Sequence, residues 1–190
     1  MPTVFMDRDG VINRNIENGY VTSWDQFVWL PGAVESIAFL YKQSWNIFIT
    51  TNQACIGKGI VDQREISGIH NCMQDELRRS GSKITQFYVC PHTSEMKCNC
   101  RKPKPGMLLE AKEEHSLDLS SCYFIGDSIN DMIAANSVGC TTVLVRTGLG
   151  KSHEKNIRLL QLADYYCNNI TEAVHIIIWK ESVSSGESLH

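Results

Sequence analysis

Two aspartates separated by one residue follow a short apolar run near the start of the chain. The run VFM at 4–6 ends at Asp7, and Asp9 lies two residues further on. A third aspartate, Asp127, follows another apolar run at 122–126. Neighbouring carboxylates repel one another unless one takes up a proton or a cation lies between them. Hard oxygen ligands suit Mg²⁺, which typically combines carboxylates, water and a substrate phosphate. The three aspartates therefore predict a magnesium site, whereas a single aspartate would more simply cap a turn.

Groups that can bind phosphate follow two further segments. In TTNQ at 50–53, a hydroxyl and a carboxamide can donate to phosphate oxygens, although Thr and Asn also end strands for local turn reasons. In RKPKPGM at 101–107, two prolines stiffen the segment before a predicted helix, so Lys102 or Lys104 can be directed at the site. A cation there would neutralise charge in a transition state. We interpret Lys104 as a solvated lysine and Lys102 as the site lysine.

The segment CPHTSEMKCNC at 90–100 carries a different set of metal ligands. Three thiols and one imidazole make a closed tetrahedral set for structural Zn²⁺. The alternative is a chance cluster of free cysteines. We predict a small zinc-bound loop formed by Cys90, His92, Cys98 and Cys100. The other five cysteines are expected to be ordinary core or surface residues.

Composition limits the classes of function. The chain has 190 residues and a formal net charge of -3, so no basic footprint for nucleic acid is present. No apolar run approaches the roughly 20 residues that a membrane span needs. We read no signal peptide at the N-terminus and expect a cytoplasmic protein without disulfides. One domain is predicted over 1–180, followed by a flexible tail over 181–190.

Near-continuous apolar runs recur along the chain and predict strands that are covered on both faces of a parallel sheet. These runs are 3–6, 45–50, 86–90, 122–126 and 141–145, with a closing strand within 164–169 and a helix over 170–180. Helical stripes separate the runs, at Val34, Ile37, Ala38 and Tyr41 and at Ile66, Ile69, Met73 and Leu77. This order is typical of an α/β doubly wound sheet, in which ligands bind beyond the carboxyl ends of the strands.

The motifs DRDG at 7–10, TNQ at 51–53, the lysine of RKP and GDSINDM at 126–132 occur in the order of the four motifs of the haloacid dehalogenase (HAD) phosphatase superfamily. The chain resembles this family over residues 3–150. The Cys/His loop that runs into RKP is typical of its subgroup of heptose-bisphosphate and histidinol-phosphate phosphatases. The resemblance implies a mostly parallel, Rossmann-like HAD fold with no large cap domain.

The resemblance also implies roles for individual residues. Asp7 would be the nucleophile that forms an aspartyl phosphate, and Asp9 the general acid and base, with Thr51 and Lys102 assisting. Mg²⁺ would be held by the carboxylates of Asp7 and Asp127 and by the backbone carbonyl of Asp9. Asp131 would support the site. The substrate-binding residues would be Glu17, Asn18, Gly19, Tyr20, Thr51, Asn52, Gln53, Ala54, Arg101 and Lys102.

The segments ENGYV at 17–21 and RKPKPGML at 101–108 resemble those of the heptose enzymes of this subgroup, and this resemblance favours a particular substrate. The expected reaction removes the 7-phosphate of D-glycero-D-manno-heptose 1,7-bisphosphate, in the synthesis of nucleotide-activated heptose and lipopolysaccharide core precursors. Ala54 and Cys55 depart from the Ser-Gly that is common in the heptose enzymes, and Ser128 replaces a frequent lysine. A histidinol-phosphate or other sugar-phosphate phosphatase therefore stays open as the alternative.

Two readings from other classes also stay open, a phospho-accepting signalling module and a zinc-dependent interaction scaffold. A switch module must avoid the turnover step that Asp9 would supply, and all four motifs are intact in this chain. We expect a monomer that binds a small phosphorylated sugar, and neither nucleic acid nor a membrane.

Overall fold

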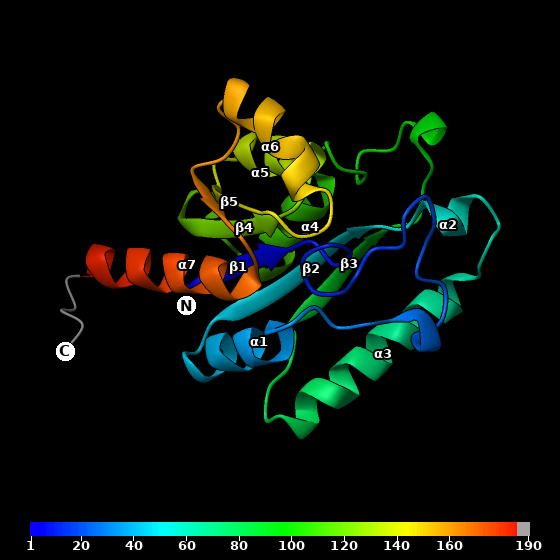
Figure 1. The fold of residues 1–190 in the computed structure, drawn as a ribbon, viewed down its shortest axis with the longest axis horizontal. Helices are drawn as coiled ribbons and strands as arrows, with labels where there is room; N and C mark the ends of the chain where they lie inside the picture. Colours follow the sequence, from blue (N-terminus) through cyan, green and yellow to red (C-terminus); the bar gives the residue numbers. More distant parts are fainter. Residues whose placement is uncertain (186–190) are drawn as a thin grey trace.

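Six parallel strands form one sheet in the computed structural model, which describes residues 1–185 (Figure 1). The order across the sheet is β3-β2-β1-β4-β5-β6, so the chain moves outward from β1 in both directions. All carboxyl ends of these parallel strands meet at one edge. The bounds are β1 Thr3–Met6, β2 Asn46–Asn52, β3 Gln86–Cys90, β4 Cys122–Gly126, β5 Thr141–Val145 and β6 Tyr165–Cys167.

Helices cover both faces of the sheet. Side chains of α1 (Ala33–Lys42), α3 (Gln63–Arg79) and α7 (Ile170–Ser185) pack with one face, and those of α4 (Gly106–His115), α5 (Ile129–Asn136) and α6 (Gly150–Leu159) with the other. Figure 1 shows these two groups on opposite sides of the strands. Because each strand is buried on both faces, its sequence is a continuous apolar run.

The predicted strands at 3–6, 86–90, 122–126 and 141–145 are confirmed with the same bounds. The strand predicted at 45–50 instead covers 46–52, because Thr51 and Asn52 still pair with Val89 and Cys90 of β3. Both residues thus belong to the end of the strand rather than to the loop after it. The closing strand within 164–169 is the three-residue β6.

The predicted inward face of the first helix is confirmed at Ile37, which is buried, and at Val34, which packs against the core, but not at Tyr41. The helix α1 buries Ala33, Ser36, Ile37 and Leu40, whereas Tyr41 is 38% exposed. Leu40 and Tyr41 are adjacent in the sequence and both are largely apolar. The helical period alone therefore fits a buried face that includes either residue. The stripe on α3 is confirmed, since all four of its predicted residues are buried.

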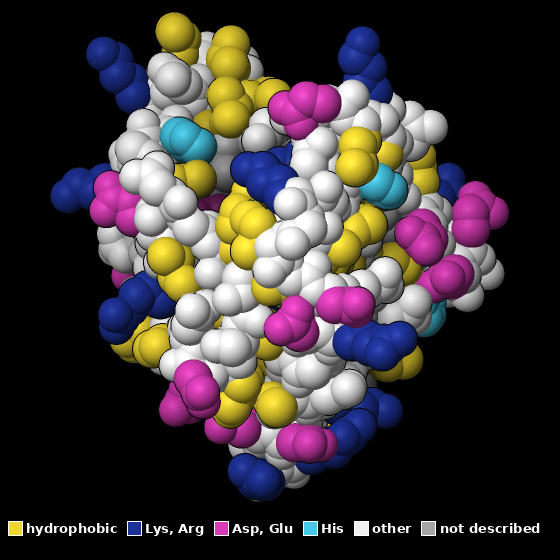
Figure 2. Space-filling view, turned by 90° about the vertical axis from the view of Figure 1, so that its right-hand side faces the viewer, with side chains coloured by type: hydrophobic (Ala, Val, Ile, Leu, Met, Phe, Trp, Pro, Cys, Tyr) yellow, Lys and Arg dark blue, Asp and Glu magenta, His cyan; other side chains and the backbone are white. Residues whose placement is uncertain are grey.

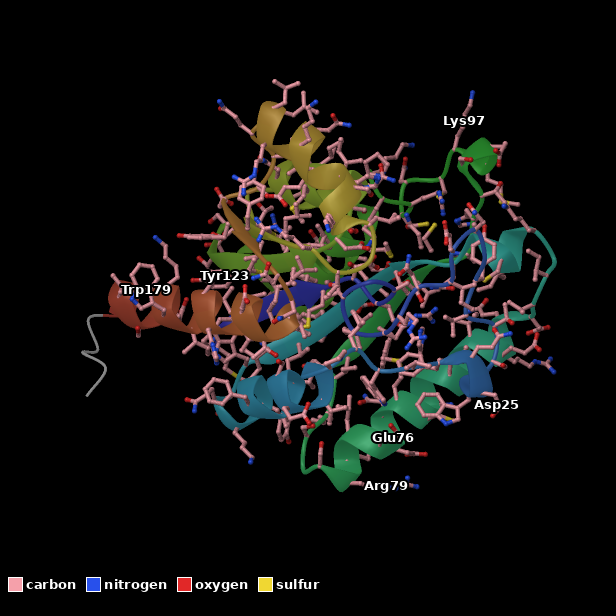
Figure 3. The ribbon with its side chains drawn as sticks, in the orientation of Figure 1. Asp25, Glu76, Arg79, Lys97, Tyr123 and Trp179 are labelled. Carbon is pink, nitrogen blue, oxygen red and sulfur yellow. The ribbon has the colours of Figure 1, made fainter. Side chains whose placement is uncertain are left out.

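The final helix extends beyond its predicted end at 180. It continues to Ser185, so the first five residues of the predicted tail over 181–190 are helical, and 186–190 lie outside the described residues. The hydroxyl of Tyr123, on β4, donates to the Glu181 carboxylate at 3.0 Å. Figure 3 shows Tyr123 beside this helix, on the side where Trp179 is labelled. This hydrogen bond holds the last turns of α7 on the sheet.

Two long loops leave the carboxyl edge of the sheet. One covers 7–32, between β1 and α1, and includes the 3₁₀ turn η1 (Trp24–Gln26); the other covers 91–105, between β3 and α4. Figure 3 shows η1, marked by Asp25, beside α3, marked by Glu76. The indole N–H of Trp29 donates to the Glu76 carboxylate, which ties the first loop to α3.

Candidate active site

Asp7 and Asp127 lie side by side because their strands are neighbours. Strand β1 pairs with β4 up to Met6 and Ile125, and the Asp7 N–H continues the ladder by donating to the Ile125 carbonyl at 3.0 Å. Carboxylate oxygens of Asp7, Asp127 and Asp131 lie within 4.8 Å of one another. The sheet therefore brings the predicted pair together and adds Asp131, from the first turn of α5, to the cluster.

Two glycines make room for the Asp127 carboxylate. Gly10 and Gly148 both have positive φ, +91° and +56°, and a Cβ at either position would overlap the Asp127 side chain. The carboxylate also accepts a hydrogen bond from the Leu149 N–H at 2.8 Å. Only glycine meets both the conformational and the spatial requirement here, and neither glycine was singled out from the sequence.

Lys102 joins two of these aspartates. Its ammonium lies 2.9 Å from Asp7 Oδ1 and 2.6 Å from an Asp131 oxygen, and it donates to the Thr50 carbonyl at 2.8 Å. The side chain is only 4% exposed. Burial opposes its charge, but the carboxylates of Asp131 and Asp7 outweigh burial and raise the Lys102 pKa. Lys102 is therefore a buried, permanently charged group. Lys104 instead donates to the carbonyls of Lys97 and Cys98, away from the aspartates.

Asn52 holds the backbone of Lys102 rather than pointing freely into solution. Its amide donates to the Lys102 carbonyl at 3.0 Å, and its carbonyl oxygen accepts from the Lys102 N–H at 3.1 Å. This pair of bonds connects β2 to the loop 91–105 and fixes the segment that carries the lysine. The sequence had predicted only a substrate contact for Asn52.

Asp9 is held by polar neighbours and is not part of the cluster formed by Asp7, Asp127 and Asp131. Its carboxylate accepts from Asn13 at 2.9 Å and from Gln53 at 2.8 Å, and it forms an ion pair with Arg8 at 2.9 Å. Burial opposes ionisation of Asp9, but Arg8 and these hydrogen bonds keep its pKa below the ordinary value. Gln53 also donates to the Thr51 hydroxyl at 2.8 Å, so this glutamine connects two predicted site residues.

The pKa values of Asp7 and Asp127 are shifted in the opposite direction. Burial raises the pKa of Asp7 to about 7 against the effect of Lys102, and the charges of Asp131 and Asp9 add to the rise. Burial also raises the pKa of Asp127 well above its ordinary value, helped by Asp131 and Asp7. Two buried carboxyls that resist ionisation in this way are suited to binding a cation.

Ser128 begins α5 and holds Asp131. Its N–H and hydroxyl both donate to Asp131 Oδ2, at 3.0 and 2.6 Å, while the Asp131 N–H donates back to the hydroxyl at 3.3 Å. This capping box orients Asp131 toward Lys102. The serine that departs from the family pattern thus has a structural role, and it supplies no positive charge.

A cavity of about 680 Å³ opens above these groups. Most of the predicted substrate residues line it, including Glu17, Asn18, Gly19 and Tyr20 from the first loop. Ala54 and Arg101 are not among the lining residues; Arg101 donates to the His92 carbonyl at 3.1 Å. Residues that sequence reasoning missed also line the cavity: Asn15, Ile16, Val21, Lys58, Ser128, Asn130, Leu149 and His153.

Lys58 is a second lysine that lines this cavity. Its ammonium lies 5.4 Å from the centre of the Tyr20 ring, and interaction with Tyr20 raises its pKa. No ion pair involves Lys58 among the described residues, whereas Lys102 is shared by two carboxylates. A lone lysine after TNQ carries no motif, which explains why the sequence did not indicate it.

The predicted zinc ligands form a second cluster. The distances run from 3.2 Å, between His92 Nδ1 and Cys100 Sγ, to 3.7 Å, between Cys90 Sγ and Cys98 Sγ. All four ligand atoms lie within 4.8 Å of one another. Ligands bound to Zn²⁺ at about 2.0–2.3 Å in a tetrahedron would be roughly 3.5 Å apart. The cluster therefore has the chemistry and the spacing of a closed zinc site.

Charge is dispersed on the face that includes the second loop. Figure 2 shows Lys and Arg side chains scattered among acidic and hydrophobic ones, without a continuous basic patch on this face. Within 1–185, no helix combines the length and apolar character of a membrane span.

Comparisons with known proteins identify relatives of the chain. Residues 99–173 match the HAD-hydrolase-like family model. The D-glycero-beta-D-manno-heptose-1,7-bisphosphate 7-phosphatase of Pseudomonas aeruginosa is 38% identical over 147 residues, which cover 77% of this chain and 82% of the relative. The D-glycero-alpha-D-manno-heptose-1,7-bisphosphate 7-phosphatase of Mycobacterium bovis is 40% identical over 137 residues, which cover 71% of this chain and 72% of the relative.

A solved structure matches nearly the whole chain. The D,D-heptose 1,7-bisphosphate phosphatase of B. bronchiseptica, in a crystal structure complexed with magnesium and phosphate, has a TM-score of 0.90 at 30% identity, over 95% of this chain and 99% of that one. Sequence and fold thus give the same group of relatives.

Proposed function

The chain belongs to the HAD-like hydrolase family, and from this premise we propose that it removes a phosphate from a sugar phosphate through a phosphorylated Asp7. The observation that carries the proposal is the contact of buried Lys102 with Asp7 at the cavity, beside the Asp127 carboxylate. A nucleophile, a cation and a second carboxylate then surround the place where a phosphate would bind.

Mg²⁺ fits the carboxylate donors of Asp7 and Asp127. The carboxylates of Asp7 and Asp127 are hard oxygen ligands, their oxygens lie within 4.8 Å, and both pKa values are raised as long as no cation neutralises them. The Asp9 backbone carbonyl completes the set that the family resemblance implies. When bound, Mg²⁺ supplies positive charge to the phosphate oxygens during transfer. Asp131 is engaged by Lys102 and Ser128, so we assign it a supporting role.

Phosphate transfer would begin at the free oxygen of Asp7. Its Oδ1 accepts from the Arg8 N–H at 2.8 Å and contacts Lys102, whereas Oδ2 has no hydrogen bond among the described residues. As the bond from Oδ2 to phosphorus forms, the bond from phosphorus to the leaving oxygen breaks, and the electron pair stays on that oxygen. Lys102 holds the Asp7 carboxylate in place and offsets the charge of the incoming phosphate.

Asp9 would move the protons. In the first step its carboxyl protonates the leaving oxygen, and in the second its carboxylate takes a proton from the water that releases phosphate from Asp7. The second step suits its lowered pKa. In the first step, the negative charge of the bound phosphate raises the pKa of Asp9, which favours the protonated form. The two aspartates of DRDG thereby divide the reaction between them.

Heptose 1,7-bisphosphate is the substrate that we propose, on the names of the relatives and on one feature of the cavity. A bisphosphate carries a second anionic group away from the reacting phosphate. Lys58, next to Tyr20, forms no direct ion pair among the described residues, although the charge of Glu95 acts on it, and we assign it to that second phosphate. The zinc loop, with Cys90, His92, Cys98 and Cys100, is assigned a structural role because its ligand set is closed.

The deciding experiment compares kcat/KM for the alpha and beta anomers of heptose 1,7-bisphosphate, the corresponding 1-phosphate and histidinol phosphate. We expect the highest kcat/KM for a bisphosphate. EDTA should abolish the activity, and Mg²⁺ should restore it. Lys58→Met should raise KM for the bisphosphate about tenfold, as expected for the loss of one charge-assisted contact, and should leave kcat nearly unchanged; Lys151→Met, at an exposed position outside the cavity, is the matched control.

Equal activity on histidinol phosphate would refute the bisphosphate assignment, and rescue by Zn²⁺ alone would mean that the two metals have been exchanged. Phosphate that stays on Asp7 without turnover would instead indicate a signalling module. A cytoplasmic location, a single domain and a monomer remain predictions.

A further inference from the structure

Arg8, the residue between the two motif aspartates, has a completely buried side chain. A buried charge is tolerated only when it is paired and its donors are used. Two of its nitrogens face Asp9: Nε lies 3.2 Å from Oδ2, and Nη2 lies 3.1 Å from Oδ1 and 2.9 Å from Oδ2. The guanidinium therefore forms a two-pronged contact that fixes the plane of the Asp9 carboxylate.

The third nitrogen of Arg8 points to a different element. Its Nη1 lies 3.1 Å from Nε2 of His70, which is a buried residue of α3. A guanidinium has only donors, so Nε2 must be the acceptor and the imidazole proton must lie on Nδ1. The His70 ring is stacked on Phe87 of β3, with centroids 4.3 Å apart and planes at 10°.

The environment keeps His70 neutral. Burial and, to a smaller degree, the positive charge of Arg8 together lower its pKa to about 3, against the smaller effect of Asp9. An imidazole in this state cannot compete with Asp9 for protons, and it accepts from Arg8 across the physiological pH range.

We propose that His70 is a positioning residue of the phosphatase reaction, which acts through Arg8 to hold the Asp9 carboxyl group where it can protonate the leaving oxygen. The proposal rests on the function assigned above to Asp9. Without the Nη1 acceptor, a buried N–H of Arg8 would lack its partner, and the guanidinium would turn toward another acceptor at the expense of its contact with Asp9. The alternative is that His70 only fills the core between α3 and β3.

Leaving groups of different basicity distinguish these two roles. A sugar alkoxide needs a proton as it departs, whereas p-nitrophenolate departs readily without one. The ratio kcat/KM reports the steps up to departure of the leaving group and not the later hydrolysis at Asp7. We expect His70→Leu to lower kcat/KM for heptose 1,7-bisphosphate at least about thirtyfold, and for p-nitrophenyl phosphate less than about threefold, as a partial loss of general acid catalysis would do.

Two variants complete the test. His70→Gln retains an acceptor near the position of Nε2 and should restore most of the activity on the sugar phosphate. Ile69→Val, one residue away on the buried face of α3, removes packing without touching this hydrogen bond and should reduce stability but not change the ratio between the two substrates. Thermal unfolding of every variant is measured in parallel.

The outcomes separate the inference from the function on which it rests. An equal loss on both substrates in His70→Leu, or the absence of rescue by His70→Gln, would overturn the positioning role while leaving the phosphatase intact. A wild-type protein that cleaves neither substrate would refute the proposed function itself, and the role of His70 with it.

Discussion

The Asp7 carboxylate has two partners on one oxygen and no described partner on the other. Asp7→Asn retains the shape and the hydrogen bond from Arg8 but removes the nucleophilic oxygen. We expect phosphate release to fall at least about a thousandfold, comparable to the loss of a catalytic carboxylate in other hydrolases. The thermal unfolding temperature should change little, since the variant relieves a buried carboxylate of its charge.

The control is Asp75→Asn, which removes an aspartate whose side chain is 61% exposed and paired with Arg78 at the surface. It should retain full activity. Turnover by Asp7→Asn above a few per cent of the wild-type rate would show that another group attacks the phosphate.

Protons and Mg²⁺ compete for the carboxyl groups of Asp7 and Asp127, which gives a prediction for magnesium binding. The pKa of Asp7 is raised to about 7 and that of Asp127 is raised as well, so both groups are protonated at pH values where an ordinary aspartate is charged. Binding Mg²⁺ must displace these protons. We expect the affinity for Mg²⁺ to rise as the pH is raised through the pKa of Asp7, about 7, and to level off only above the pKa values of both groups, with proton release that isothermal titration calorimetry detects in buffers of different ionisation enthalpy. An affinity that does not change as the pH is raised through 7 would contradict the assignment.

At the scale of elements, the loop 91–105 carries both the Cys/His cluster and the approach to Lys102. Cys98→Ser removes one of the four ligands, and we expect lower zinc content, measured by atomic absorption, together with a lower unfolding temperature, because a closed site contributes folding energy. Activity should fall as well, since the same loop positions Lys102.

The same substitution at Cys72, a half-buried cysteine of α3 outside the cluster, is the matched control and should leave the metal content unchanged. Zinc bound at full stoichiometry by Cys98→Ser would show that the ligand set is different.

At the scale of the whole molecule, α7 returns across the sheet and the Tyr123–Glu181 hydrogen bond fixes its far end. Tyr123→Phe should lower the free energy of unfolding by about 0.5–1.5 kcal/mol, the usual value of one hydrogen bond, as measured by urea denaturation. The kinetic constants should not change, because Tyr123 does not line the cavity. Tyr41→Phe, on the exposed side of α1, should leave stability unchanged.

Much of this architecture could be predicted from the sequence, because a parallel strand that is buried on both faces has a continuous run of apolar residues. The meeting of Asp7 and Asp127 follows from strand ends that share an edge. Other parts depend on three-dimensional contacts that no local pattern contains. The exchange of hydrogen bonds between Asn52 and the Lys102 backbone joins residues 50 positions apart, and the approach of Lys58 to Tyr20 depends on the path of a loop.

The guanidinium of Arg8 has consequences for the evolutionary history of the chain. Two of its nitrogens contact Asp9 and the third contacts His70. Lysine carries a single ammonium on a flexible stem and cannot reproduce both contacts. A lineage that replaced the histidine would have to supply another acceptor on the same turn of α3. In an alignment of descendants, positions 8 and 70 are therefore expected to change together, although 62 residues separate them along the polypeptide.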